Sequence, residues 1–134
     1  MKAYPLRLAP GQDLRAALEA LLREQALDAA FVLQAIGSLS VARIRFAGQP
    51  ASNELRGDTE ILSLAGTLSP DGAHLHLSVS NARGEVIGGH ADYGCIVRTT
   101  AEVLLALLPE HHFAREHDAA SGFKELVVRT RPPS

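Results

Sequence analysis

Residues 60–80 show a strand–turn–strand pattern that commits the centre of the chain to a β-sheet. Polar and apolar side chains alternate before and after the turn Ser69-Pro70-Asp71-Gly72, as expected for strands with one buried face. Proline presets the backbone angle of this turn, and glycine tolerates the reversal. The alternation predicts that His74 and His76 share one face of the second strand, opposite an inward face. The predicted inward residues are Leu62, Leu64 and Leu68 in the first strand and Leu75, Leu77 and Val79 in the second.

The chain before this pattern is predicted to hold an edge strand, one helix and a long strand. Tyr4–Leu8 alternates and contains Pro5, which an edge strand tolerates. Asp13 can cap a helix with a single apolar stripe, formed by Leu14, Ala17, Leu18, Leu21 and Leu22. The apolar run Ala29–Ile36 is typical of a buried strand, which Gly37 and Ser38 bend into the alternating segment Val41–Phe46. Residues 47–58 are rich in turn formers and are expected to form a loop.

The chain after residue 94 is harder to assign. Cys95–Leu108 fits a strand, although its second half would also make a helix; the β-branched residues at its start favour the strand. Phe113–His117 and Phe123–Arg129 are predicted strands, and the tail Arg131–Ser134 is expected to fray.

Length, charge and cysteine content limit the class of protein. With 134 residues and neither a linker nor an internal repeat, the sequence predicts one domain over residues 1–134. A formal net charge of −2 argues against strong autonomous binding to nucleic acid. The single Cys95 excludes an internal disulfide and a cysteine zinc cage. We expect a cytoplasmic protein without membrane contact, because there is no signal-peptide core and no apolar run near about 20 residues.

The turn after the second strand determines whether a third histidine joins the first two. A three-residue loop at Ala82–Gly84 would place His76 opposite His90, with Cβ atoms about 4.5–5.5 Å apart and His74 one diagonal away. A loop one residue shorter would send His90 to the other face of the sheet. The sequence leaves both registers open.

In the first register, His74, His76 and His90 are predicted ligands of zinc or another transition-metal ion. Imidazole nitrogen suits these ions, and three ligands leave a coordination position open for water or a ligand. The alternative is that His74 and His76 are polar residues on a solvated or subunit-facing surface, since a His-x-His pair is common. Asp92 or Glu60 could complete the shell or act as a base, although the spacing requires neither. The remaining histidines are predicted surface residues: His111, His112 and His117.

Two arginines form a second candidate site. Arg43 and Arg45 share a face of the predicted strand Val41–Phe46 and could bind an anion or a partner, although a solvated sheet face is the commoner outcome. Other catalytic patterns are missing from the sequence: there is neither a phosphate-binding glycine loop with its lysine nor a Gly-x-Ser-x-Gly nucleophile elbow.

Several motifs occur in a fixed order along the chain. They are Glu60–Leu68, His74-Leu75-His76-Leu77-Ser78, Gly84-x-Val86-Ile87-Gly88-Gly89-His90, Gly94-Cys95-Ile96-Val97 and, near the end, Phe113-x-Arg115-Glu116. Together they resemble the plant and prokaryote conserved (PPC) domain, also called DUF296, over essentially the whole chain. The resemblance implies an α/β (α+β) domain with a mostly antiparallel, strongly bent β-sheet and one main helix near the N-terminus. It also implies a homotrimer.

Two functions remain open at this point. One is a trimeric binding or regulatory module that acts through protein partners or, weakly, through DNA; the low aromatic content (4%) and the lack of an acid–base pair favour it. In plants the PPC domain follows an AT-hook, an Arg-Gly-Arg-Pro element that this sequence lacks, and a DNA-binding function is implied only by analogy with bacterial members. The other is a metal-dependent small-molecule enzyme or ligand binder that uses the three histidines.

Overall fold

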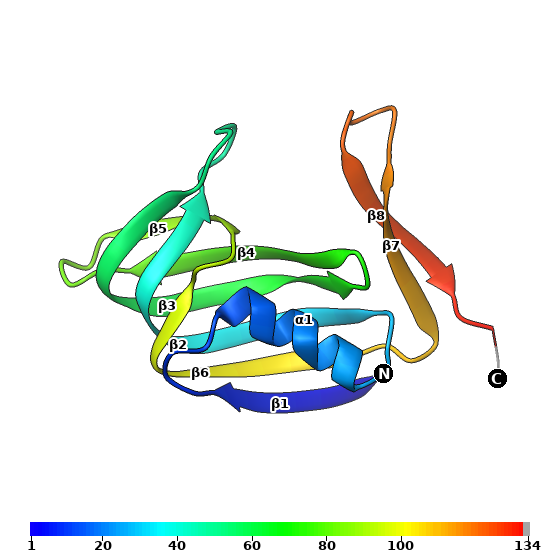
Figure 1. Ribbon diagram of the computed structural model, residues 1–134, viewed down its shortest axis with the longest axis horizontal. Helices are drawn as coiled ribbons and strands as arrows, with labels where there is room; N and C mark the ends of the chain where they lie inside the picture. Colours follow the sequence, from blue (N-terminus) through cyan, green and yellow to red (C-terminus); the bar gives the residue numbers. More distant parts are fainter. Residues whose placement is uncertain (133–134) are drawn as a thin grey trace.

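The computed structural model of the chain describes residues 1–132. This range contains one helix and eight strands (Figure 1). In chain order they are β1 (Lys2–Leu8), α1 (Leu14–Glu24), β2 (Ala30–Arg45), β3 (Asn53–Ser69), β4 (Gly72–Ser80), β5 (Val86–Ala91), β6 (Ile96–Leu107), β7 (His111–His117) and β8 (Lys124–Thr130).

Six strands form one antiparallel sheet in the order β1-β6-β2-β3-β4-β5. The sheet bends so strongly that β5, at its far edge, also pairs with the end of β2. Strands β2, β3, β4 and β5 therefore close on themselves, while β1 and β6 extend the sheet on the other side. The bent, mostly antiparallel sheet with one helix confirms the predicted fold class.

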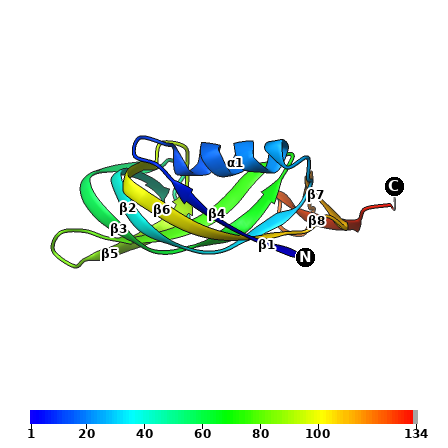
Figure 2. The same ribbon diagram turned by 90° about the horizontal axis from the view of Figure 1, so that it is seen from below.

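The helix α1 lies on the concave side of the sheet (Figure 2). Its N-terminus is capped as predicted, because an Asp13 carboxylate oxygen accepts a hydrogen bond from the backbone N–H of Ala16. Leu14, Leu18 and Leu22 are buried against the sheet and carry the core. α1 has 11 residues, and the described part of the chain holds no helix with the length and apolarity that crossing a membrane requires.

The bend depends on a close approach between strands that glycine permits. Gly37 has a φ of +144°, and a Cβ atom there would lie 2.2 Å from the carbonyl oxygen of Thr100 in β6. A side chain at this position would therefore hold β2 and β6 apart. The register between β2 and its neighbours also shifts next to Leu39, which adds a bulge at the bend.

Most predicted elements are confirmed, including the favoured strand in the segment after Cys95, which is β6. Two predictions are wrong. The predicted loop 47–58 is too long, because residues 53–58 belong to β3, and residues 53–56 pair with the second half of β2. Leu62 is 45% exposed rather than inward, because a bulge between Ile61 and Ser63 exchanges the two faces and buries Ile61 instead. The predicted fraying of the tail concerns, in part, residues 133–134, which lie outside the described residues.

Strands β7 and β8 form a separate two-stranded sheet, here called the β7–β8 arm, which projects from one end of the main sheet (Figure 1). Several contacts attach the arm to the body, among them a hydrogen bond from the Phe113 backbone N–H to the Asp28 carbonyl oxygen. The Phe113 ring meets the Phe31 ring edge-on, with centroids 5.8 Å apart. The backbone N–H of Arg115 donates to the Asp71 carboxylate at 2.8 Å.

Candidate metal centre

The turn between β4 and β5 has the three-residue loop that brings His90 opposite His76. Gly84 adopts a left-handed conformation with φ +77°, its N–H donates to the carbonyl oxygen of Asn81, and the N–H of Asn81 donates to the carbonyl oxygen of Glu85. The ladder from this turn pairs His76 with His90. The first of the two open registers is therefore the one that forms.

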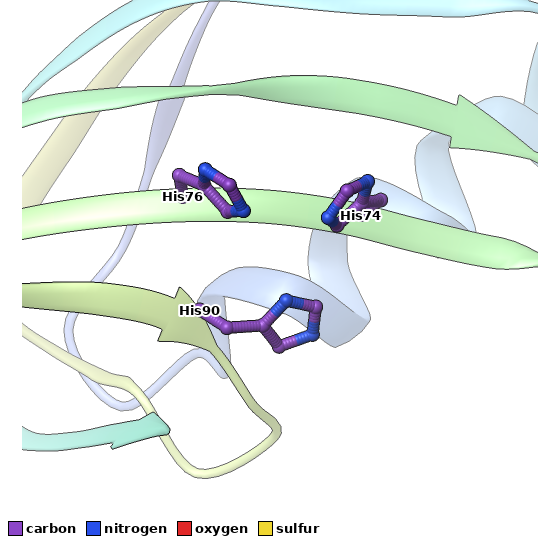
Figure 3. A group of neighbouring side chains, drawn as sticks. All are labelled: His74, His76 and His90. Carbon is purple, nitrogen blue, oxygen red and sulfur yellow. The ribbon is translucent and has the colours of Figure 1, made fainter. Parts of the chain in front are cut away.

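The three histidines converge on a shared space. His74 and His76 extend from β4, and the ring of His90 extends from β5 toward His74 (Figure 3). One nitrogen from each ring lies within 4.8 Å of the others. Tetrahedral zinc with three Zn–N bonds needs nitrogens about 3.3 Å apart, so the rings have to approach one another by at most about 1.5 Å. Rotation about the side-chain bonds supplies this movement, and the donor set therefore fits a transition-metal ion.

Small residues make room for these rings. Ala65 in β3 pairs with His76, so the row across the sheet reads Ala65, His76, His90 and Arg45. Gly89, next to His90, lets β5 lie against β2, because a Cβ atom there would come within 2.5 Å of the Arg45 carbonyl oxygen. The sequence thus places two small residues, Ala65 and Gly89, beside the histidines.

The electrostatic surroundings favour neutral imidazoles. Burial, together with the neighbouring Arg45 and His74, lowers the pKa of His90 to about 4. Burial and the nearby Arg115 also lower the pKa of His74, although Glu125 opposes this shift. Neutral imidazole is the form that donates an electron pair to a metal, so at pH 7 no proton has to leave His90 before a metal binds.

The rings border a cavity of about 590 Å³ that opens to solvent. The edges of β3, β4 and β5 and the segment after β2 form its walls, and His76 is exposed in it. Its lining includes Arg45, Phe46, Ser63, Ala65, His74, His76, Ser78 and His90. An ion on the three histidines would therefore face a space large enough for a small molecule.

The structure separates the two predicted arginines. Arg45 pairs with His90 in the ladder and lines the cavity. Arg43 forms an ion pair with Glu54 at 3.7 Å and packs its side chain against Gly94, outside that cavity. Sequence reasoning did not connect Arg45 with the histidines, because their proximity comes from the closure of β5 on β2. It also missed Arg115, which lies near His74.

The other candidates lie apart from this cluster. The Asp92 carboxylate accepts a hydrogen bond from Ser52 at 2.7 Å, and Glu60 lies in β3 opposite Ser80. His111, His112 and His117 belong to the β7–β8 arm, where His112 contacts Asp28 at 3.1 Å. Cys95 is fully buried, and burial raises the pKa of its thiol, which makes it a poor nucleophile.

The chain is similar to a segment of much longer curated proteins. It is 53% identical over 129 residues to the bifunctional protein GlmU of Synechococcus sp. (strain JA-2-3B'a(2-13)), covering 96% of this chain and 20% of that protein. A second Synechococcus protein of the same name is 49% identical over 138 residues. The chain thus spans about a fifth of the length of the curated relatives it matches.

Solved structures share the fold over nearly the whole chain. A hypothetical protein from Salmonella enterica has a TM-score of 0.95 at 43% identity and covers 98% of this chain and 95% of its own. The protein AF0104 of Archaeoglobus fulgidus, described as metal-containing, has a TM-score of 0.79 at 31% identity, with 95% and 94% covered. More distant structures, 19% and 23% identical and named as candidate DNA-binding proteins, show the fold alone.

A family model matches most of the chain. It describes the Plants and Prokaryotes Conserved (PCC) domain, which is the PPC domain of the sequence resemblance, and it covers residues 1–109. The matched range contains the helix, the six-stranded sheet and all three clustered histidines. The chain therefore belongs to the Plants and Prokaryotes Conserved domain family.

Proposed function

We propose that the chain is a metal-dependent ligand-binding domain in which His74, His76 and His90 hold one transition-metal ion. The observation that carries this proposal is the convergence of three imidazoles, from two adjacent strands, at the border of a cavity of about 590 Å³. The description of the Archaeoglobus relative as metal-containing supports it. Zinc is the first candidate, because a closed-shell ion accepts three histidines and keeps a further position for a ligand.

Ligand binding is the activity that this donor set supports best. A hydrolytic reaction would also require a general base beside the metal-bound water. The Asp92 carboxylate is engaged by the Ser52 hydroxyl and the backbone N–H of Tyr93, and this hydrogen bonding, led by Ser52, lowers its pKa. A metal-dependent enzyme that uses the same histidines is the second form of this proposal, and turnover would distinguish it from binding.

Elemental analysis tests the metal site directly. The protein is purified without chelators, as the wild type, as His76→Ala, and as His117→Ala, a control whose histidine lies in the β7–β8 arm. We expect about one transition-metal ion per chain in the wild type and in the control, and a marked loss in His76→Ala. A wild type that neither retains a metal nor takes up added zinc would contradict the proposal.

We also propose that the domain assembles as a homotrimer through the sheet face opposite α1. That face exposes large apolar side chains: Leu33 is 50% exposed, Ile36 54%, Leu62 45% and Leu104 39%. These residues come from β2, β3 and β6, which are neighbours in the sheet, and such surfaces mark protein interfaces. The number three comes from the family resemblance.

Light scattering coupled to size exclusion tests this assembly. Ile36→Glu places a charge in the centre of the apolar face and is expected to yield monomers, whereas Val86→Glu, at a 62% exposed position at the start of β5, keeps the trimer. A monomeric wild type would refute the assembly.

Regulation through DNA is the second candidate function, favoured by the names of two distant structures. A formal net charge of −2 predicts weak binding at physiological salt. We expect no tight complex with duplex DNA in a mobility-shift assay near 150 mM salt. Sub-micromolar affinity under these conditions would overturn the argument from charge.

A further inference from the structure

A second cavity, of about 620 Å³, adjoins the histidine cluster. His74 and His90 line both cavities, so an ion on the histidines would face both spaces. The second cavity lies between the main sheet and the β7–β8 arm. Its charged lining consists of Arg15, Arg45, Asp71, Arg115, Lys124 and Glu125.

Three of the cations that line this cavity have no acidic partner. Among residues 1–132, no carboxylate oxygen lies within ion-pair distance of Arg45, Arg115 or Lys124. Most arginines elsewhere are paired with carboxylates, as in Arg43–Glu54, Arg56–Glu54, Arg83–Glu85, Arg98–Asp58 and Arg129–Glu116. In the described part of the chain, Arg7 and Arg23 are the other arginines without such a pair. Arg15, at the same cavity, is also paired, with Glu19 and Asp92. The cavity therefore places three cations outside ion pairs, with the carboxylates of Asp71 and Glu125 in the same lining, next to the candidate metal centre.

The two arginines are held in place by contacts that leave donors free. One terminal nitrogen of Arg115 donates to the Thr67 hydroxyl at 2.7 Å. The backbone N–H of Arg115 donates to one carboxylate oxygen of Asp71. Arg45 stands directly opposite His90 in the ladder, and its guanidinium makes one long contact, 3.4 Å, to the Gln49 carbonyl oxygen. Each guanidinium keeps further N–H groups for a ligand.

A cation on three neutral histidines would add two positive charges to this cluster. The resulting repulsion favours an anion that lies close to both the metal and the guanidinium groups. Carboxylate and phosphate oxygens meet both needs, since they coordinate transition metals and accept paired hydrogen bonds from arginine.

We propose that this cavity binds the oxyanion group, carboxylate or phosphate, of a small molecule, with one oxygen on the metal and the others on Arg45 and Arg115. Lys124 adds charge at the entrance. The inference rests on the proposed metal site. A small molecule fits better than a nucleic-acid backbone, because the unpaired cations gather in one concave cavity of a protein whose formal net charge is −2.

Anion titrations of the cobalt-loaded protein test the proposal, since the visible spectrum of cobalt(II) changes when an anion enters its coordination shell. Inorganic phosphate and acetate are the two probes, and they distinguish a phosphate site from a carboxylate site. Arg45→Gln and Arg115→Gln are each expected to weaken binding of the preferred probe by about tenfold or more, the cost of one charge-assisted hydrogen bond. Arg98→Gln removes an arginine paired with Asp58 and is expected to bind as the wild type does.

Thermal unfolding and metal content are measured for every variant first. Arg115→Gln also loses the contact with Thr67, so Arg45→Gln keeps the test valid if Arg115→Gln proves unstable. Saturable binding that both variants weaken, with Arg98→Gln unaffected, supports the proposal.

The remaining outcomes separate this inference from the metal proposal. A protein that holds metal but shows no saturable anion binding, or binding that no arginine variant changes, overturns the anion site and leaves the metal site standing. Calorimetric titration with phosphate covers the case without metal: a protein that holds no metal but binds phosphate through both arginines retains the anion site and refutes the metal centre. Displacement of the probe by a short DNA duplex at lower concentration would assign the cations to nucleic acid and overturn the small-molecule proposal.

Discussion

Replacing Gly89 by alanine should displace His90 without touching any histidine. Gly89 pairs with Leu77 in β4 and faces β2 on its other side. A Cβ atom there would lie 2.5 Å from the Arg45 carbonyl oxygen and 3.0 Å from the Ile44 Cγ2 atom. Carbon and oxygen normally approach to about 3.3 Å, so β5 has to move away from β2 by about 0.8 Å.

The expected losses follow from this movement. Overpacking of this kind costs about 1–3 kcal/mol of the free energy of unfolding. His90 follows Gly89 in β5, so the movement also carries its ring away from its position beside His74 and His76. Disturbing the supports of metal ligands typically weakens metal affinity by about tenfold to a hundredfold, and we expect a loss in that range.

Urea unfolding of the metal-free protein measures the first loss, and zinc competition with a chromophoric chelator measures the second. Gly11→Ala is the matched control: it introduces the same methyl group at φ +87° in the segment between β1 and α1, where no atom lies within 4 Å of the new Cβ. It should cost about 1–2 kcal/mol through backbone strain and leave zinc affinity unchanged. Wild-type stability in Gly89→Ala would refute the steric argument. An equal loss of zinc affinity in both variants would attribute it to general instability.

Three further predictions concern protonation, helix capping and metal removal. In proton NMR titrations of the metal-free protein, His90 should titrate near pH 4. The unfolded chain takes up that proton near pH 6.5, so the free energy of unfolding should fall as the pH falls from about 6.5 to about 4. Asp13→Ala should lower the free energy of unfolding by about 1–2 kcal/mol, measured in urea, because Asp13 also accepts from the Gly94 N–H at 2.7 Å; an unchanged midpoint would contradict this. Removing the metal with a chelator should lower the melting temperature, by the equivalent of about 2.7 kcal/mol when free zinc had been a hundredfold above its dissociation constant, and His76→Ala should show no such change.

Local rules were sufficient where neighbouring residues determine the structure. The Asp13 cap and the leucine stripe of α1 are signals within one segment, and both are confirmed. The three-residue turn ending at Gly84 fixed the pairing of His76 with His90, which the sequence could narrow to two registers. The metal function of these histidines remains a prediction. The backbone register shows that His76 and His90 are paired, but it does not show that their side chains bind a metal ion.

Features that depend on distant segments were beyond local rules. The bulge after Ile61 reversed the expected direction of Leu62, and nothing in the alternation marks where a bulge falls. Residues 53–58 belong to β3 despite their turn-forming composition, because residues 53–56 pair with β2. Arg45 and Arg115 lie 70 positions apart in the numbering, and a closed sheet and a folded-back arm bring them to one cavity.

The β7–β8 arm divides the wall of the second cavity between two units of different stability. Its strands bond to each other through seven residue pairs, whereas it meets the body mainly at its base and at Asp71. Amide hydrogens in the arm should therefore exchange with solvent through local openings that leave β2 and β3 closed. A ligand held between Arg45 on the body and Arg115 on the arm would link the two units. Amide exchange would then slow in the arm far more than in the main sheet. Ligand binding at the cavity would therefore be detected as reduced local opening of β7 and β8.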